Sequence, residues 1–216
     1  MRFMLLIIIL ILTFGCSAPT ARMVIPNIDD SSSVIVMDLR PASEKINKTF
    51  SLIITNDAYA IYRSGDKPFN PSPIRSFQHR LYEKYSAQGV VPEAKIYHFV
   101  IYKNLQAELR SDISRQYHRE SSDAKIPSNT HKYGVDGLAS VISSEEFEHF
   151  QKEYQRALYT EFENPNQKSV FTVYLEAEIG GKRTFIKTMT PLVLSENTNS
   201  HLMAVETALA FFLDQY

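Results

Sequence analysis

The sequence predicts an α+β domain: a mixed or antiparallel sheet with amphipathic helices on one face, plus a helical insertion at about residues 104–167. Residues 171–188 alternate apolar and polar side chains around Gly180–Gly181, which is typical of an antiparallel hairpin. Residues 73–88 and 199–215 carry apolar side chains at helical spacing. Strand-like and helical segments do not alternate strictly, so a doubly wound parallel sheet is not expected.

Three strand-like segments precede the first helix. Residues 34–40 are β-branched and apolar on both faces, which predicts an interior strand that ends at Pro41. Residues 49–55 and 58–63 predict two more strands joined by a tight turn. A fourth strand, apolar on both faces except for one histidine, is expected at residues 95–102.

Capping residues mark where the helices begin and end. Ser72, placed before a proline, predicts the start of the first helix, and Gly89 predicts its end. Asn104 predicts the start of the insertion's first helix. Ser143 and Glu146 form a capping box that opens a third helix, which ends near residue 164.

The N-terminus predicts export and attachment to lipid. Arg2 precedes ten apolar residues, and Gly15–Cys16 follow shortly after them. The apolar run is too short to span a bilayer, which needs about 20 residues. Cys16, the only cysteine of the chain, stands where the signal would be cut, as in the lipobox of bacterial lipoproteins. Thr13 departs from that motif, which usually has leucine there, and an ordinary secretion signal beside a chance cysteine is the alternative.

We therefore expect residues 1–15 to be a signal peptide and Cys16 to carry the acyl chains, each contributing about 0.8 kcal/mol per buried methylene. In such lipoproteins aspartate after the cysteine favours the inner membrane, so Ser17 predicts the outer membrane, facing the periplasm. Residues 16–33 lack periodicity and are expected to tether the lipid to a single domain at 34–216. The alternative is that residues 23–25 pair as an edge strand.

Composition and motifs exclude several classes of function. The 23 basic and 24 acidic residues give a net charge of −1, without the basic excess of nucleic-acid-binding proteins. One cysteine forms neither an internal disulfide nor a cysteine-rich zinc site. The sequence holds no P-loop, no dinucleotide-binding glycine motif, no GxSxG and no HExxH. We expect no cofactor, no metal and no nucleic-acid partner.

A few polar residues are candidates for a site. Asp38 and Arg40 lie on one side of their predicted strand, where they form either a structural ion pair near a sheet edge or part of a polar ligand pocket. His98, inside an apolar strand, is expected to be a hydrogen-bonded structural residue rather than a catalytic base. His118 and His131 flank a polar loop with two acidic residues, which is a candidate metal site, and a solvated loop explains the same residues.

The order of segments resembles the YajG-like outer-membrane lipoproteins of bacteria. The matching pieces are Cys16, Asp38 to Pro41, Gln88–Gly89, Lys103 to Ala107, the hairpin from Phe171 to Thr188 and the closing helix. Residues 108–167 depart from the family pattern, which passes to the hairpin with far less helix between. The resemblance implies an envelope location and supplies no catalytic residues.

We expect a non-enzymatic, lipid-anchored envelope protein that binds a protein or another envelope component. One alternative is a periplasmic, lipid-anchored hydrolase, which needs a deep pocket that joins His, a carboxylate and Ser or Thr. Another is an accessory subunit of an envelope transport or secretion complex. In that case residues 104–160 form the docking surface and expose an apolar patch.

Overall fold

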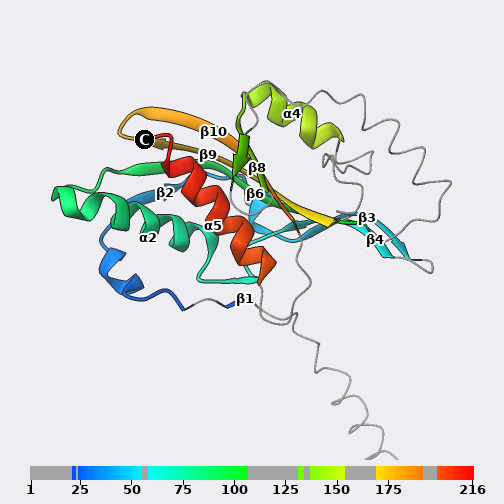
Figure 1. Ribbon diagram of the computed structural model, residues 1–216, viewed down its shortest axis with the longest axis horizontal. Helices are drawn as coiled ribbons and strands as arrows, with labels where there is room; N and C mark the ends of the chain where they lie inside the picture. Colours follow the sequence, from blue (N-terminus) through cyan, green and yellow to red (C-terminus); the bar gives the residue numbers. More distant parts are fainter. Residues whose placement is uncertain are drawn as a thin grey trace, which may run out of the picture.

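The largest element of the structure is a sheet of eight strands with the order β3-β4-β6-β9-β10-β8-β7, and β2 also pairs with β6 (Figure 1). The computed structural model describes residues 21–22, 24–54, 58–106, 131–133, 137–153, 169–191 and 199–216. The strands of this sheet are β2 Val36–Asp38, β3 Lys48–Ile54, β4 Ala58–Ser64, β6 Ala94–Gln106, β7 His131–Tyr133, β8 Gly137–Val141, β9 Ser169–Ile179 and β10 Lys182–Pro191. The β2–β6 pair is parallel and the other pairs are antiparallel, so the predicted α+β class is confirmed.

The predicted hairpin of β9 and β10 lies at the centre of the sheet. Gly180 and Gly181 form its turn with φ of 56° and 84°, a region that glycine enters without a steric penalty. Val173 and Leu175 are fully buried against the helices, and Tyr174 between them is buried on the opposite face. The hairpin is therefore covered on both faces along this stretch, whereas the sequence predicts one wet face.

Two helices cover one face of the sheet, α2 (Pro73–Tyr85) and α5 (Ser200–Leu213) (Figure 1). The Ser72 hydroxyl accepts a hydrogen bond from the backbone N–H of Arg75, which confirms the predicted cap. The rings of Phe77 in α2 and Phe212 in α5 are 5.7 Å apart, and both side chains are fully buried. Each such side chain contributes roughly 2–3 kcal/mol by leaving water.

The third helix, α4 (Ser144–Glu153), lies on the opposite face of the sheet (Figure 1). Its capping box is confirmed, because Glu146 N–H donates to the Ser143 hydroxyl at 3.1 Å and Ser143 N–H donates to the Glu146 carboxylate at 2.6 Å. The Phe147 ring packs on Phe185 and Tyr174, at centroid distances of 4.9 and 5.1 Å. The helices thus occupy both faces.

Within the helical insertion predicted at 104–167, the described residues form one helix, α4, and also strand segments that the prediction does not include. Strand β6 continues to Gln106, past the predicted cap at Asn104. Residues 131–133 and 137–141 form β7 and β8, which extend the sheet beyond β10. Only α4 is helical as predicted, while residues 107–130 and 154–168 lie outside the described residues. Short strands such as HKY carry too few residues to show a period of two.

The prediction of an interior strand at 34–40 is also wrong. The strand β2 has three residues and pairs with β6 alone among the described residues. Its neighbours Ile35 and Leu39 are 54% and 51% exposed. The physical reason is that β2 and β4 share one edge of β6: β2 pairs with residues 94–96 and β4 with residues 101–106. An apolar run does not distinguish a buried strand from an exposed edge.

The tether predicted at residues 16–33 is too long, because folded elements begin within that range. Strand β1 (Ala21–Arg22) pairs in parallel with β5 (Phe69–Asn70), and the 3-10 helix η1 (Ile28–Ser31) packs on α2. The Arg75 guanidinium donates to the Ser31 hydroxyl at 2.8 Å and also to the Ile28 carbonyl. Ser31 is fully buried. The folded domain therefore begins before residue 34.

Candidate functional site

The 3-10 helix η2 (Ala42–Lys45) fills the junction where β2 and β4 both end beside β6. It directs the buried carboxylate of Glu44 at residues 97–100 of β6, where the edge of β6 opposite β9 pairs with neither β2 nor β4. One oxygen of Glu44 lies 2.6 Å from His98 Nδ1, and the other accepts the Phe99 N–H at 3.3 Å. The side chain of Glu44 thus replaces the missing strand neighbour of β6 at this point.

A second carboxylate lies on the other side of the His98 ring. A bulge in β6 at Tyr97 sets His98 opposite Glu176 of β9, and Glu176 Oε2 is 3.8 Å from His98 Nε2. Arg183 Nε donates to Glu176 at 2.8 Å. The guanidinium of Arg183 also lies 3.8 Å from the centre of the Tyr97 ring, within the range of a cation–π contact.

This cluster has part of the geometry of a general base. A buried carboxylate that contacts Nδ1 orients an imidazole for catalysis, as Glu44 does for His98. Among the described residues no serine, threonine or cysteine hydrogen-bonds to His98. The described contacts favour the predicted structural role, in which His98 holds Glu44 and Glu176 at the sheet surface.

The predicted pair Asp38 and Arg40 forms the structural ion pair rather than a ligand pocket. The Arg40 side chain is 1% exposed and donates to both carboxylate oxygens of Asp38, at 2.9 and 3.0 Å, and to both of Asp66, at 3.0 and 2.8 Å. Burial alone would raise the pKa of Asp38, but hydrogen bonds from Arg40 and Lys45 outweigh it and lower that pKa to about 2. All the guanidinium nitrogens of Arg40 are engaged, so none is left for a ligand.

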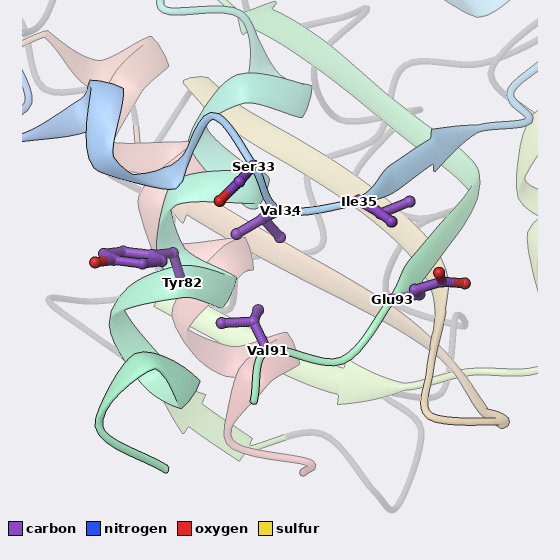
Figure 2. Close-up of a pocket in the computed structure, with 6 residues that line it drawn as sticks. All are labelled: Ser33, Val34, Ile35, Tyr82, Val91 and Glu93. Atoms are coloured by element: carbon purple, nitrogen blue, oxygen red, sulfur yellow. The ribbon is translucent and has the colours of Figure 1, made fainter. Parts of the chain in front are cut away.

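A pocket of about 330 Å³ opens beside the N-terminal ends of the parallel strands β2 and β6 (Figure 2). Its walls come from the segment that leads into β2, from α2 and from the loop that leads into β6. Figure 2 shows Val34 and Val91 on facing walls, with Glu93 at one side. The lining residues are Ser33, Val34, Ile35, Tyr82, Val91 and Glu93.

The pocket joins apolar walls to an exposed carboxylate. Glu93 is exposed and makes no hydrogen bond or ion pair of 4 Å or less with any residue in the described part of the chain. A concave apolar site with one or two polar groups is the usual form of a small binding site. Sequence patterns give little sign of this pocket, because Ser33 falls in the predicted tether and Val91 lies between a predicted helix and a predicted strand, and only the fold brings them together.

The other predicted site residues lie apart from this pocket or outside the described residues. Cys16 and His118 lie outside them, and His131 is in β7. His79, on α2, is buried with Nδ1 3.2 Å from the Ser31 hydroxyl. Within the described ranges no group of three or more His, Cys, Asp or Glu residues can hold a metal ion. No helix there is both long and apolar enough to cross a membrane.

Comparison with known proteins returns no relative. No family model, no curated protein and no solved structure matches the chain. The resemblance to YajG-like lipoproteins therefore stays a prediction from segment order.

Proposed function

We propose that this chain is a lipoprotein of the bacterial outer membrane, anchored through acylated Cys16 and facing the periplasm, and that it works by binding another protein. The N-terminal sequence supports the anchor: a basic residue, a ten-residue apolar run and Gly15–Cys16. The pocket between β2, α2 and β6 supports the binding role. Residues 33–35, which line the pocket, follow soon after the N-terminal segment, and this fits a domain held close to the membrane.

The observation that carries the binding role is the carboxylate of Glu93 beside apolar walls. An apolar side chain of a partner fits against Val34, Val91 and the Tyr82 ring, which gives the buried centre of an interface. The Glu93 carboxylate then favours a lysine or arginine next to that side chain. We therefore assign the partner a basic residue adjacent to an apolar one.

Crosslinking in living cells tests the binding role. A photoreactive amino acid at Val91 should give one crosslinked adduct with a partner protein, and the same group at Glu148, exposed on α4, should not. Adding Glu93→Gln should weaken the Val91 adduct severalfold, because the charge is lost while the shape is kept. Equal adducts at both positions, or none at Val91, would contradict the proposal.

Fractionation of cells tests the anchor separately. The full chain should be found in the outer-membrane fraction, and Cys16→Ser should be left unprocessed or released into the periplasm. Normal processing of the Cys16→Ser chain together with membrane retention would rule the anchor out. This result does not depend on the pocket.

A hydrolase is the second candidate, and the Glu44–His98 contact is the observation that favours it. It requires a nucleophile within reach of His98 Nε2. The purified chain, incubated with p-nitrophenyl esters of several chain lengths, tests this function. Hydrolysis that His98→Gln abolishes would support a hydrolase, whereas a rate equal in both proteins would count against it.

A further inference from the structure

The outer edge of β2 carries backbone groups that have no partner among the residues that the structure describes. Ile35 C=O accepts from Ala94 N–H at 3.1 Å, and Leu39 N–H donates to Ile96 C=O at 2.9 Å, so residues 35, 37 and 39 turn their backbone groups toward β6. In a strand the intervening residues turn theirs the other way. The N–H and C=O of Val36 and Asp38 therefore point outward, and no residue in the described part of the chain pairs with them. Such an edge is a template for another strand.

The side chains along this edge form an apolar stripe that is symmetric about Met37. Ile35, Met37 and Leu39 are 54%, 37% and 51% exposed. They alternate along the strand, so they lie on one face, opposite to the side of Val36, which packs against the core. Read in either direction, the stripe presents a branched apolar residue, methionine and a branched apolar residue.

We propose that β2 pairs antiparallel with β2 of a second copy of this chain, which joins the two sheets into one. In this register Met37 lies opposite Met37 of the other copy, and Ile35 lies opposite Leu39. Val36 and Asp38 of opposite copies then exchange hydrogen bonds through their outward-facing N–H and C=O groups. The contact is isologous, so it closes with two copies.

The charges at this edge allow the pairing. The stripe itself carries no charge, and in each copy Asp38 and Asp66 are matched by Arg40 and Lys45, whose contacts with them are 2.8 to 3.0 Å long. The edge thus brings no net charge to the interface, and Asp38 faces Val36 rather than another carboxylate. Like charges directly opposite each other would have opposed the pairing.

The length of chain before the domain also favours a second copy as the occupant. Only residues 17–20 separate Cys16 from β1, which is paired with β5. If Cys16 is anchored, as proposed above, copies share one membrane plane with short tethers, and this confinement raises their effective concentration. That part rests on the proposed function, whereas the pairing of β2 does not.

Disulfide crosslinking of the full chain tests both the contact and its register. Opposite residues of a non-hydrogen-bonded antiparallel pair have Cα atoms about 4.5 Å apart, within the range that a disulfide spans. With oxygen and a copper–phenanthroline catalyst, Met37→Cys should give a covalent dimer. Ile35→Cys and Leu39→Cys should each stay monomeric alone and crosslink to each other when coexpressed.

Two further sets of variants separate the possible outcomes. Each cysteine variant is repeated with Cys16→Ser, so crosslinking of the unanchored chain shows the pairing even if the anchor fails. In the Met37→Cys background, Val36→Pro removes one outward N–H and should reduce dimer formation about tenfold or more, whereas Val36→Ala should not. The proposal would be overturned if Met37→Cys and the coexpressed pair of Ile35→Cys and Leu39→Cys all stay monomeric. It would also be overturned if Ile35→Cys, expressed without Leu39→Cys, forms a covalent dimer.

Discussion

At the scale of single residues, Glu44 links the two halves of the sheet edge. Its carboxylate satisfies the Phe99 N–H, which neither β2 nor β4 reaches, and it also contacts His98. In the sequence Glu44 stands in a polar segment between two predicted strands, where an acidic residue is ordinarily solvated. Its burial follows from tertiary structure, so no local pattern predicts it.

Replacement of Glu44 should therefore destabilise the domain. Glu44→Ala leaves a buried N–H and a histidine nitrogen without their acceptor, and we expect a loss of about 2–3 kcal/mol in the free energy of unfolding, measured in urea. Glu44→Gln keeps one acceptor oxygen and should lose less. Glu148→Ala, at an exposed position of α4, should change stability by under about 0.5 kcal/mol. Equal losses for Glu44→Ala and Glu148→Ala would contradict this role.

His201 should make the stability of the domain depend on pH. Burial, and secondarily the charge of Lys103, lower the pKa of His201 to about 4 from an ordinary 6.5. The unfolded chain then binds a proton that the folded chain does not, so stability present above pH 6.5 is lost as the pH falls toward 4. His201→Phe keeps a ring against Phe69 and Phe171, whose centroids lie 5.6 and 4.4 Å from that of His201.

The measurement is urea unfolding at pH 7.5 and pH 4. The wild-type chain should lose roughly 2–3 kcal/mol more than His201→Phe between these values. If the two chains lose the same amount, His201 does not carry the acid sensitivity.

At the scale of elements, the junction of η2 with the chain after β4 determines how β2 and β4 share one edge. Gly65 N–H donates to the Asn47 side chain at 2.7 Å. A Cβ at Gly65 would lie 2.4 Å from the Lys45 carbonyl oxygen and 2.7 Å from backbone atoms of Ile46. Glycine is required at this place because two stretches of backbone touch there.

Alanine at Gly65 should separate these two stretches. We expect Gly65→Ala to lower the free energy of unfolding by about 2–3 kcal/mol, because backbone atoms cannot move aside cheaply. Gly89→Ala is the matched control: its φ of 79° disfavours alanine, but the space around it is open, so its cost should be about 1 kcal/mol. Thermal unfolding of both variants gives the order, and a milder effect at Gly65 than at Gly89 would contradict the close contact.

The sequence predicted best those elements whose signals are local. The hairpin turn at Gly180–Gly181, the Ser72 cap and the Ser143 capping box all depend on neighbouring residues, and each is confirmed. The position of residues 34–40 depends on what else occupies the edge of β6, and periodicity does not contain that information. The same holds for the pocket, whose walls join residues 33–35 to residues of α2 and of the loop before β6 that lie more than 45 positions later in the chain.

At the scale of the whole molecule, the pairing of β1 with β5 shortens the connection to the proposed anchor. Five residue steps from Cys16 to Ala21 span at most about 18 Å when fully extended. The β5 end of the domain should therefore stay near the bilayer surface, and a partner must be within reach of that surface.

Fluorescence quenching tests this placement. A fluorophore at Asn70→Cys, an exposed position, should be quenched by nitroxide-labelled headgroups in vesicles that carry the acylated chain. Insertion of twenty Gly and Ser residues after residue 20 should relieve most of the quenching, because the longer linker lets the domain move away. Equal quenching in both chains would show that the short tether does not set the distance.

The N-terminus of the mature protein tests the central claim most directly. Mass spectrometry of the chain extracted from membranes should show a first peptide that begins at Cys16 and carries a diacylglyceryl group on the sulfur and an acyl group on the amino nitrogen. A mature chain that begins at another residue, or one that begins at Cys16 with a free thiol, would contradict the account.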